Sequence, residues 1–187
     1  IEDFAIVGGH IATASLKKAV SELELFTLEG KRVRTVELPG LGTASNLVGL
    51  QDDDEVYYSF SSFTLPNQVF KSSVKTGKSA LWAKVEVPVD ASPYEVKQVF
   101  FPSRDGTQVS MFIVARKDVK LNGQNPTLLY GYGGFDVSLT SSFNTFIYPW
   151  LEAGGVYAVP NLRGGGEYGK AWHDAGRGAK KQNVFDD

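Results

Sequence analysis

The sequence predicts a mixed fold, in which an antiparallel β-repeat region is followed by the beginning of an α/β sheet. Three observations support this prediction. Short runs of alternating polar and apolar residues fill the first 90 positions, a 47-residue internal repeat occurs within them, and strand and helix patterns alternate near the C-terminus. With 187 residues, of which 42% are hydrophobic, the chain can form a sizeable core.

The alternating runs of the first region predict short strands that turn back on one another. Turn residues bound them at Gly8-Gly9, around Gly30, at the three consecutive aspartates 52–54 and around Gly77. The predicted strands cover residues 4–7, 23–28, 33–38, 56–60 and 69–74. Because the turns are so closely spaced, we expect antiparallel hairpins.

The internal repeat refines this prediction. The turn at Gly30 recurs 47 residues later at Gly77, and the strand after each turn ends in a similar sequence, Glu37-Leu38-Pro39 and Glu86-Val87-Pro88. A period of roughly 40 to 50 residues is typical of a four-stranded propeller blade. The alternative for this region is an unrelated antiparallel sandwich.

A domain boundary is predicted near residue 90, which divides the chain into residues 1–90 and 91–187. Beyond it, residues 96–101 and 109–114 predict a hairpin, because Asp105-Gly106 between them is a strong turn signal. Two buried strands and two helices follow in alternating order, over residues 126–130, 143–153, 156–159 and 168–181. This alternation predicts parallel pairing in an α/β sheet.

The composition excludes several kinds of partner and site. The net charge is only -2, and the 19 basic and 21 acidic side chains are dispersed, so neither a nucleic acid nor a membrane surface is an expected partner. The sequence has no cysteine and no apolar run near the roughly 20 residues of a transmembrane helix. His10 and His173 have no companions at metal-ligand spacing, so we expect structural histidines, no metal and no cofactor.

A glycine-rich loop follows the first predicted buried strand of the second region, with the sequence Gly131-Tyr132-Gly133-Gly134-Phe135. Glycines allow close approach of the backbone and leave amide N–H groups free to bind an anion. α/β-Hydrolases place such a loop where its donors face the oxyanion of a tetrahedral intermediate, and Tyr132 adds a neutral hydroxyl donor. The alternative is a tight turn with a packed aromatic ring.

A second glycine cluster satisfies the G-x-G-x-x-G pattern at Gly164, Gly166 and Gly169. The pattern is weak evidence for dinucleotide binding, because residues 160–163 separate the preceding strand from the first glycine. We therefore favour a structural connection, in which Arg163 and Glu167 pair with one another.

A nucleophile elbow of the form G-x-S-x-G does not occur in the sequence. His173 is not expected to be the catalytic base, because hydrolase chain order places the histidine after the nucleophile. We expect the chain to be an internal fragment, inactive by itself, whose parent continues into such an elbow within roughly 60 residues, the span of one generous crossover.

These motifs resemble those of the prolyl oligopeptidase family. The resemblance is strongest over residues 129–135, 161–169, 172–173 and 181–187, and it includes residues 101–107 and 111–114. It implies the final blades of a seven-bladed β-propeller over residues 1–90. Over residues 91–187 it implies the N-terminal part of an α/β-hydrolase peptidase domain, without the elbow.

The resemblance also implies a serine endopeptidase that cleaves short peptides on the carboxyl side of proline. In this family the position of Tyr132 supplies an oxyanion donor, and the positions of Phe135 and Val137 line the proline pocket. Relatives specific for basic residues usually have a small polar residue and tyrosine in place of Gly134-Phe135, so proline is favoured. The family's serine, aspartate, histidine, arginine and tryptophan site residues would lie beyond Asp187.

The expected partners are short proline-containing peptides and the rest of the parent chain. A cytoplasmic location is expected, with the periplasm as the alternative. Two other functions remain open from the sequence: a non-catalytic β-propeller interaction module, and a dinucleotide-binding domain.

Overall fold

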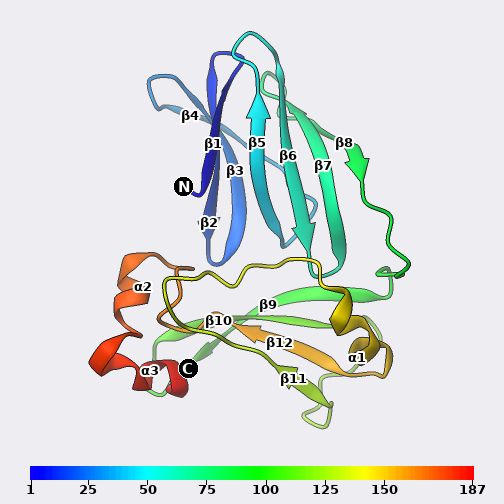
Figure 1. Ribbon diagram of the computed structural model, residues 1–187, viewed down its shortest axis with the longest axis vertical. Coiled ribbons are helices and arrows are strands. Elements are labelled where there is room, and N and C mark those ends of the chain that lie inside the picture. The colour runs from blue at the N-terminus through cyan, green and yellow to red at the C-terminus, as the bar shows by residue number, and fades with distance from the viewer. The chain divides into compact units, whose positions relative to one another are not determined.

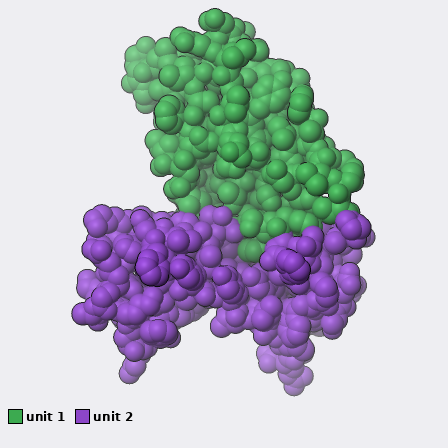
Figure 2. All heavy atoms as spheres, in the orientation of Figure 1, with its two compact units in different colours: residues 1–87, 141–143 green, residues 88–140, 144–187 purple.

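The structure, a computed structural model, describes residues 1–187 and contains twelve strands and three short α-helices (Figure 1). The chain forms two compact units, which Figure 2 distinguishes by colour. Unit 1 comprises Ile1–Val87 with Ser141–Phe143, and unit 2 comprises Pro88–Thr140 with Asn144–Asp187.

Unit 1 consists of two four-stranded antiparallel sheets, each with its strands in sequential order. The first contains β1 (Asp3–Val7), β2 (His10–Lys17), β3 (Val20–Thr27) and β4 (Arg32–Val36). The second contains β5 (Thr43–Gly49), β6 (Glu55–Ser62), β7 (Leu65–Ser73) and β8 (Ser79–Lys84). Four-stranded meanders of this kind are the building units of propellers, so the predicted fold of this region is confirmed.

Three of these strands, β2, β5 and β8, are not among those predicted from alternation, although the repeat predicted a strand after Gly77, where β8 lies. The inward-facing positions of β2 and β5 include Ala12, Ala14 and Ala44, which are buried but too weakly apolar to produce a clear alternation. Strand β8 is almost entirely exposed and has no inward-facing stripe at all. Pairing with neighbouring strands, rather than an alternating pattern of their own, makes these three segments strands.

The 47-residue repeat corresponds to a structural repeat. Gly30 lies in the turn between β3 and β4, and Gly77 lies in the equivalent turn between β7 and β8. Both glycines have a positive φ, 83° and 72°, which a residue with a Cβ rarely adopts. The repeated sequence therefore specifies the last hairpin of each sheet.

The core of unit 1 is one cluster contributed by both sheets, and it includes Leu23, Leu25, Val56, Tyr58 and Phe60. Phe70 lies beside it: its ring stacks on Tyr58 at a centroid distance of 5.6 Å, and Phe60 meets it edge-on at 6.4 Å. The Tyr58 hydroxyl donates to Ser79 Oγ at 3.2 Å, so this large ring is buried with its polar atom satisfied.

Unit 2 contains one mixed sheet with the strand order β11-β12-β10-β9. Strands β9 (Tyr94–Pro102) and β10 (Gln108–Arg116) form the predicted antiparallel hairpin around Asp105-Gly106. Strands β11 (Thr127–Leu129) and β12 (Val156–Pro160) form the predicted parallel pair. Strand β12 is buried throughout because it lies inside the sheet.

Strand β11 is not the buried strand that the sequence predicted. It is the edge of the sheet, and Leu129 is 65% exposed because no strand of this chain pairs with its outer side. An apolar strand at an open edge is a surface on which a further strand can pair.

The helices of unit 2 are shorter than predicted. Residues 143–153 contain a 3₁₀ turn, η1 (Thr145–Ile147), followed by α1 (Tyr148–Glu152). The single helix predicted over residues 168–181 is wrong, because this region is divided into α2 (Lys170–Asp174), η2 (Gly178–Lys180) and α3 (Gln182–Asp186). Gly178, with a φ of 57°, breaks the helical path. No helix of the chain has the length and apolar character needed to cross a membrane.

A buried ion network centred on Arg163, which is 4% exposed, joins three parts of unit 2. Its guanidinium donates to Asp187 at 2.6 and 3.0 Å, to Asp105 at 2.6 Å and to Ser103 Oγ at 3.2 Å. The Arg163 N–H also donates to Asp187 at 2.9 Å. The hydrogen bond from Arg163 lowers the pKa of Asp105, and the hydrogen bond to Asp187 raises the pKa of Arg163.

The predicted pair between Arg163 and Glu167 is therefore wrong. Residues 163–167 lie in a loop, so a spacing of four does not bring their side chains onto one face as it would in a helix. Glu167 instead belongs to a separate polar cluster.

We predict that Phe60→Ala lowers the free energy of unfolding by about 3 to 5 kcal/mol, because it removes a ring from the core between the two sheets. The matched control is Phe4→Ala, since Phe4 is 64% exposed and its removal should change this free energy by about 0.5 kcal/mol or less. Urea denaturation of the complete protein measures both. Equal effects of the two variants would contradict the assignment of the core.

We predict that Arg163→Ala destabilises the protein by roughly 3 to 5 kcal/mol at pH 7, because it leaves the fully buried Asp187 side chain without a cation. Lys17→Ala is the control, because Lys17 and Glu22 form a surface pair, with side chains 64% and 35% exposed, which should contribute about 1 kcal/mol or less. Urea unfolding curves for both variants test this difference, and a loss of 1 kcal/mol or less for Arg163→Ala would refute it.

Candidate active site

All three predicted site residues lie on the connection between β11 and η1, residues 130–144. Tyr130 N–H still donates to Ala158 O at 2.9 Å, as an extension of the parallel β11–β12 ladder, and the chain then leaves the sheet at Gly131. The connection therefore starts at the carboxyl end of a parallel strand, which is where ligand sites of α/β sheets occur.

The glycines of this connection are required by close packing. Gly133 has a φ of 62°, and a Cβ on it would lie 2.5 Å from Val184 Cγ1 and 2.8 Å from Arg163 O. The second glycine cluster provides the opposing surface. A Cβ on Gly164 would lie 2.5 Å from Gly133 O, and a Cβ on Gly166 would lie 2.5 Å from Asp136 O. The two glycine clusters thus pack backbone against backbone.

This packing explains the G-x-G-x-x-G match. Gly164 N–H donates to Trp172 O at 3.0 Å and Gly165 N–H donates to Leu162 O at 3.3 Å, so two of the amides that would bind a pyrophosphate already have partners. The backbone of Gly133 and Asp136 fills the space next to the cluster. The glycines have a packing role here.

A tight turn places Phe135 at the tip of the loop. Val137 N–H donates to Gly134 O at 3.0 Å, and the two central residues, Phe135 and Asp136, have φ values of 53° and 59°. Positive φ at both central positions is the geometry of a type I′ turn, which normally uses glycine, asparagine or aspartate. Phenylalanine in this conformation is strained, and its ring is 87% exposed.

Polar contacts hold the strained turn in place. Asp136 N–H lies 3.2 Å from Gly164 O and 3.1 Å from His173 Nδ1, and His173 Nδ1 lies 2.7 Å from the same carbonyl oxygen. A proton on Nδ1 is consistent with these distances, because the carbonyl can accept from both groups. On the other side of the turn, Lys181 Nζ donates to Gly133 O at 2.6 Å.

The donors of the loop are not used within the structure. The amides of residues 131–135 donate no hydrogen bond, and the hydroxyl of the half-exposed Tyr132 has no partner. By contrast, the carbonyl oxygens of Gly133 and Gly134 accept from Lys181 and Val137. The loop therefore presents unpaired N–H and O–H groups, while two of its carbonyl oxygens already accept hydrogen bonds. Unpaired donors are what a site for an oxyanion requires.

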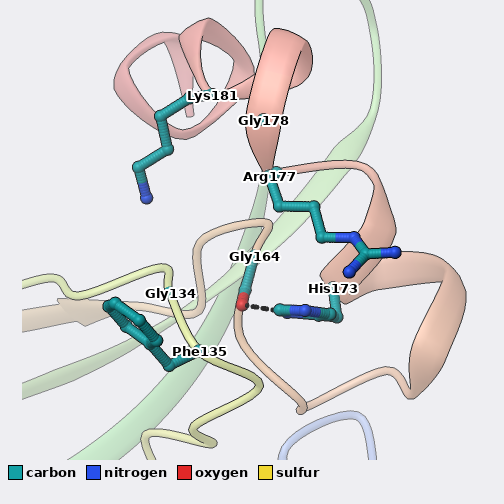
Figure 3. Close-up of a pocket in the computed structure, with 8 residues that line it drawn as sticks. Gly134, Phe135, Gly164, His173, Arg177, Gly178 and Lys181 are labelled. Atoms are coloured by element: carbon teal, nitrogen blue, oxygen red, sulfur yellow. Dashed lines mark hydrogen bonds between the residues drawn. The ribbon is translucent and has the colours of Figure 1, made fainter.

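A pocket of about 410 Å³ opens beside the turn (Figure 3). Phe135 and Lys181 lie on one side of it, and His173 and Arg177 lie on the other, with the Gly164 carbonyl between them. Tyr132 and Val137 do not line it, so only one of the three predicted site residues does. Lys181 and Arg177 could not be predicted as lining residues, because the breaks between short helices bring them there.

Nowhere in the chain do three or more histidine, aspartate or glutamate side chains gather as they would around a metal ion.

Comparisons with known proteins give a consistent result for both units. Residues 1–85 match the family profile described as prolyl oligopeptidase, N-terminal β-propeller domain, and residues 141–187 match that of the prolyl oligopeptidase family. The chain is 46% identical to the prolyl endopeptidase of Elizabethkingia miricola over 180 residues and 38% identical to that of Dictyostelium discoideum over 178 residues. These alignments cover 96% and 92% of this chain but 26% and 23% of the relatives.

Solved structures agree with these matches. One, from a structural and mechanistic analysis of two prolyl endopeptidases, is 64% identical with a TM-score of 0.89, over 98% of this chain and 27% of that one. Prolyl oligopeptidase B from Galerina marginata, bound to a 25mer macrocyclization substrate, is 28% identical with a TM-score of 0.88, over 98% of this chain and 26% of that one. The chain spans about a quarter of the length of the curated relatives above. It belongs to the prolyl oligopeptidase family, and it covers the end of the β-propeller and the start of the peptidase domain.

Proposed function

We propose that this chain supplies the oxyanion side and part of the proline pocket of a serine endopeptidase that cleaves short peptides on the carboxyl side of proline. The observation that carries the proposal is the loop of residues 131–137, in which the amides of residues 131–135 and the Tyr132 hydroxyl are unpaired while the backbone is fixed by the second glycine cluster. The nucleophile, acid and base would come from the remaining three quarters of a protein with the length of its relatives.

The proposed role of Tyr132 follows from the chemistry of acyl transfer. Attack on a peptide carbonyl creates a negative oxygen, and a donor that is already oriented stabilises that charge without reorganising. The Tyr132 hydroxyl can serve as such a donor, because no protein acceptor competes for it. Its bond should be stronger in the transition state than in the ground state, which accelerates the chemical step.

The strained turn supports the proposed proline pocket. A backbone conformation that phenylalanine rarely adopts is maintained at Phe135, and such strain often marks a functional position. The result is an exposed aromatic ring beside the unpaired donors, with Val137 two residues further on. An apolar pyrrolidine ring can pack on this surface while the adjacent carbonyl faces the donors.

The open edge of β11 supports the proposed continuation of the sheet. A further parallel strand paired there would end at the same edge of the sheet as the Tyr132 loop. In α/β-hydrolases the nucleophile elbow follows a strand at that edge, where its serine lies close to the oxyanion donors. Because this sequence has no such elbow, we propose that the isolated chain has no peptidase activity.

We predict that Tyr132→Phe in the complete protein lowers kcat on the order of 10² to 10³-fold with little change in KM, which corresponds to about 2.7 to 4 kcal/mol of transition-state stabilisation. The assay should use a prolyl-amide substrate with rate-limiting acylation, since slow product release would mask the effect. Tyr130→Phe, two residues earlier, is the control and should retain the wild-type kcat. A Tyr132→Phe variant that folds normally and keeps kcat within about twofold would assign this tyrosine to packing alone.

We predict that Phe135→Ala reduces the preference for proline over alanine at the cleavage site by roughly 10- to 200-fold in kcat/KM, or about 1 to 3 kcal/mol, because it removes one apolar wall. Phe146→Ala offers a matched control, because Phe146 is equally exposed but does not line the pocket. Competition assays with paired prolyl and alanyl substrates measure this ratio. An unchanged ratio in Phe135→Ala would exclude this ring from the proline pocket.

A further inference from the structure

Two buried side chains hold the backbone of Leu139 from both sides. Glu167 Oε1 accepts from Leu139 N–H at 2.8 Å, and Asn161 Nδ2 donates to Leu139 O at 2.7 Å. Asn161 is completely buried and Glu167 almost completely. Together they take the place of a neighbouring strand for this residue, and we call the pair the Leu139 clamp.

The clamp is itself fixed to the sheet of unit 2. Ser110 Oγ on β10 donates to Asn161 Oδ1 at 2.9 Å, and Asn161 N–H donates to Ser110 O at 2.8 Å. The Tyr168 hydroxyl in turn donates to Ser110 Oγ at 2.7 Å. Leu139 is therefore bound to a rigid element through side chains that have almost no freedom to move.

The clamp lies on the downstream side of the strained turn. The other anchors, at Gly133 and Asp136, hold its upstream and central parts. Leu139 follows Val137 by two residues, so its position limits how far Phe135 and Asp136 can relax towards ordinary negative φ. Releasing Leu139 would free one end of the segment that carries the proposed substrate contacts.

We propose that Glu167 and Asn161 are positioning residues, which hold the Tyr132–Phe135 loop in its active geometry through Leu139, and that Glu167 does so through its hydrogen-bond acceptor rather than through its charge. The effect on catalysis rests on the function proposed for Tyr132 and Phe135. The clamp itself does not, because it is defined by contacts within this chain.

The environment of Glu167 indicates why the charge is dispensable. Only Oε1 has donors, whereas Oε2 is buried and has no hydrogen-bond partner. Glu167 forms no ion pair, and the titratable groups that interact with it are the acidic Asp136 and the phenol of Tyr168. Burial raises the pKa of Glu167, against the opposing effect of the Leu139 N–H. A buried carboxylate without a cation is costly.

The space around Oε2 fits a neutral group. A Cβ on Gly165 would lie 2.2 Å from Oε2 and 2.9 Å from Val137 O, so the absence of a side chain at Gly165 leaves room for both atoms. A proton on Oε2, or the amide of a glutamine, would place a donor beside Gly165, in the space that the Val137 carbonyl oxygen also borders. Glutamine should therefore replace Glu167 with the clamp intact.

The sign of the pH dependence follows from the raised pKa. The neutral form of Glu167 is favoured in the folded protein, so its stabilising contribution is complete at low pH and is lost as the pH rises through the folded-state pKa. Glu167→Gln should remove this loss, so the activity of this variant should decline less than that of the wild type as the pH rises through the folded-state pKa of Glu167.

The test compares Glu167→Gln with Glu167→Met in the complete protein, because the two side chains have similar volumes and only glutamine offers an acceptor. Hydrogen exchange at the Leu139 amide reports on the clamp directly, and steady-state kinetics with a prolyl-amide substrate report on the loop. For Glu167→Met we expect Leu139 exchange to accelerate by about tenfold or more. Its kcat should fall on the order of 10²-fold, with a much smaller change in KM. Glu167→Gln should match the wild type in both measurements at neutral pH.

Two further variants complete the design. Asn161→Leu removes the other side of the clamp and should produce the same pattern as Glu167→Met, which keeps the test decisive if one of the two fails to fold. Tyr58→Phe is the control, because it removes a buried tyrosine's hydroxyl bond, to Ser79, and leaves the clamp and the residues that fix it unchanged. It should keep both the wild-type exchange rate and the wild-type kcat.

Protected Leu139 exchange together with an unchanged kcat in the folded Glu167→Met variant would overturn the positioning role. A Glu167→Gln variant as impaired as Glu167→Met would overturn the proposal that Glu167 acts through its hydrogen-bond acceptor rather than through its charge. If the complete wild-type protein lacked prolyl peptidase activity, the proposed function would fail, whereas Leu139 exchange in the same variants would still support or refute the clamp.

Discussion

Close backbone packing between the two glycine clusters determines where the candidate site lies. The carbonyl groups of Gly133 and Asp136 lie directly over Gly164 and Gly166, at distances that leave no room for a Cβ. This contact fixes the loop through main-chain atoms, which have far less freedom than side chains. It also leaves the amides of residues 131–135 unpaired, because the loop is held through its carbonyl side and by its neighbours. The exposed donors and the strained turn both depend on it.

The short segment of residues 161–167 serves both sides of this contact. Its glycines support the loop, Asn161 and Glu167 hold Leu139, and Arg163 binds the hairpin turn at Ser103 and Asp105. One rigid connection after β12 thereby joins the loop to the sheet. A substitution in this segment would disturb the loop without touching a substrate, which is why its effects should appear in kcat as well as in stability.

The two buried acids of this region illustrate opposite ways to accommodate a carboxyl group. The Asp187 carboxylate receives several hydrogen bonds from Arg163, so its charge is compensated within the protein. Glu167 has one well-placed donor and no cation, so burial favours its neutral form. The first arrangement holds segments together through an ion pair, and the second holds Leu139 through a hydrogen-bond acceptor.

Features that depend on local chemistry could be predicted from the sequence alone: the blade hairpins at Gly30 and Gly77, the hairpin at Asp105-Gly106, the loop that carries Tyr132, Phe135 and Val137, and the family. Tertiary structure alone decided the partners of Arg163, the Leu139 clamp, the exposed edge of β11, the strands rich in small residues and the contribution of Lys181 to the pocket. Turn preferences and hydrophobic periodicity act between residues close in sequence. Arg163 instead meets Asp187 and Asp105 across 24 and 58 residues, so these contacts exist only once the sheet has brought the segments together.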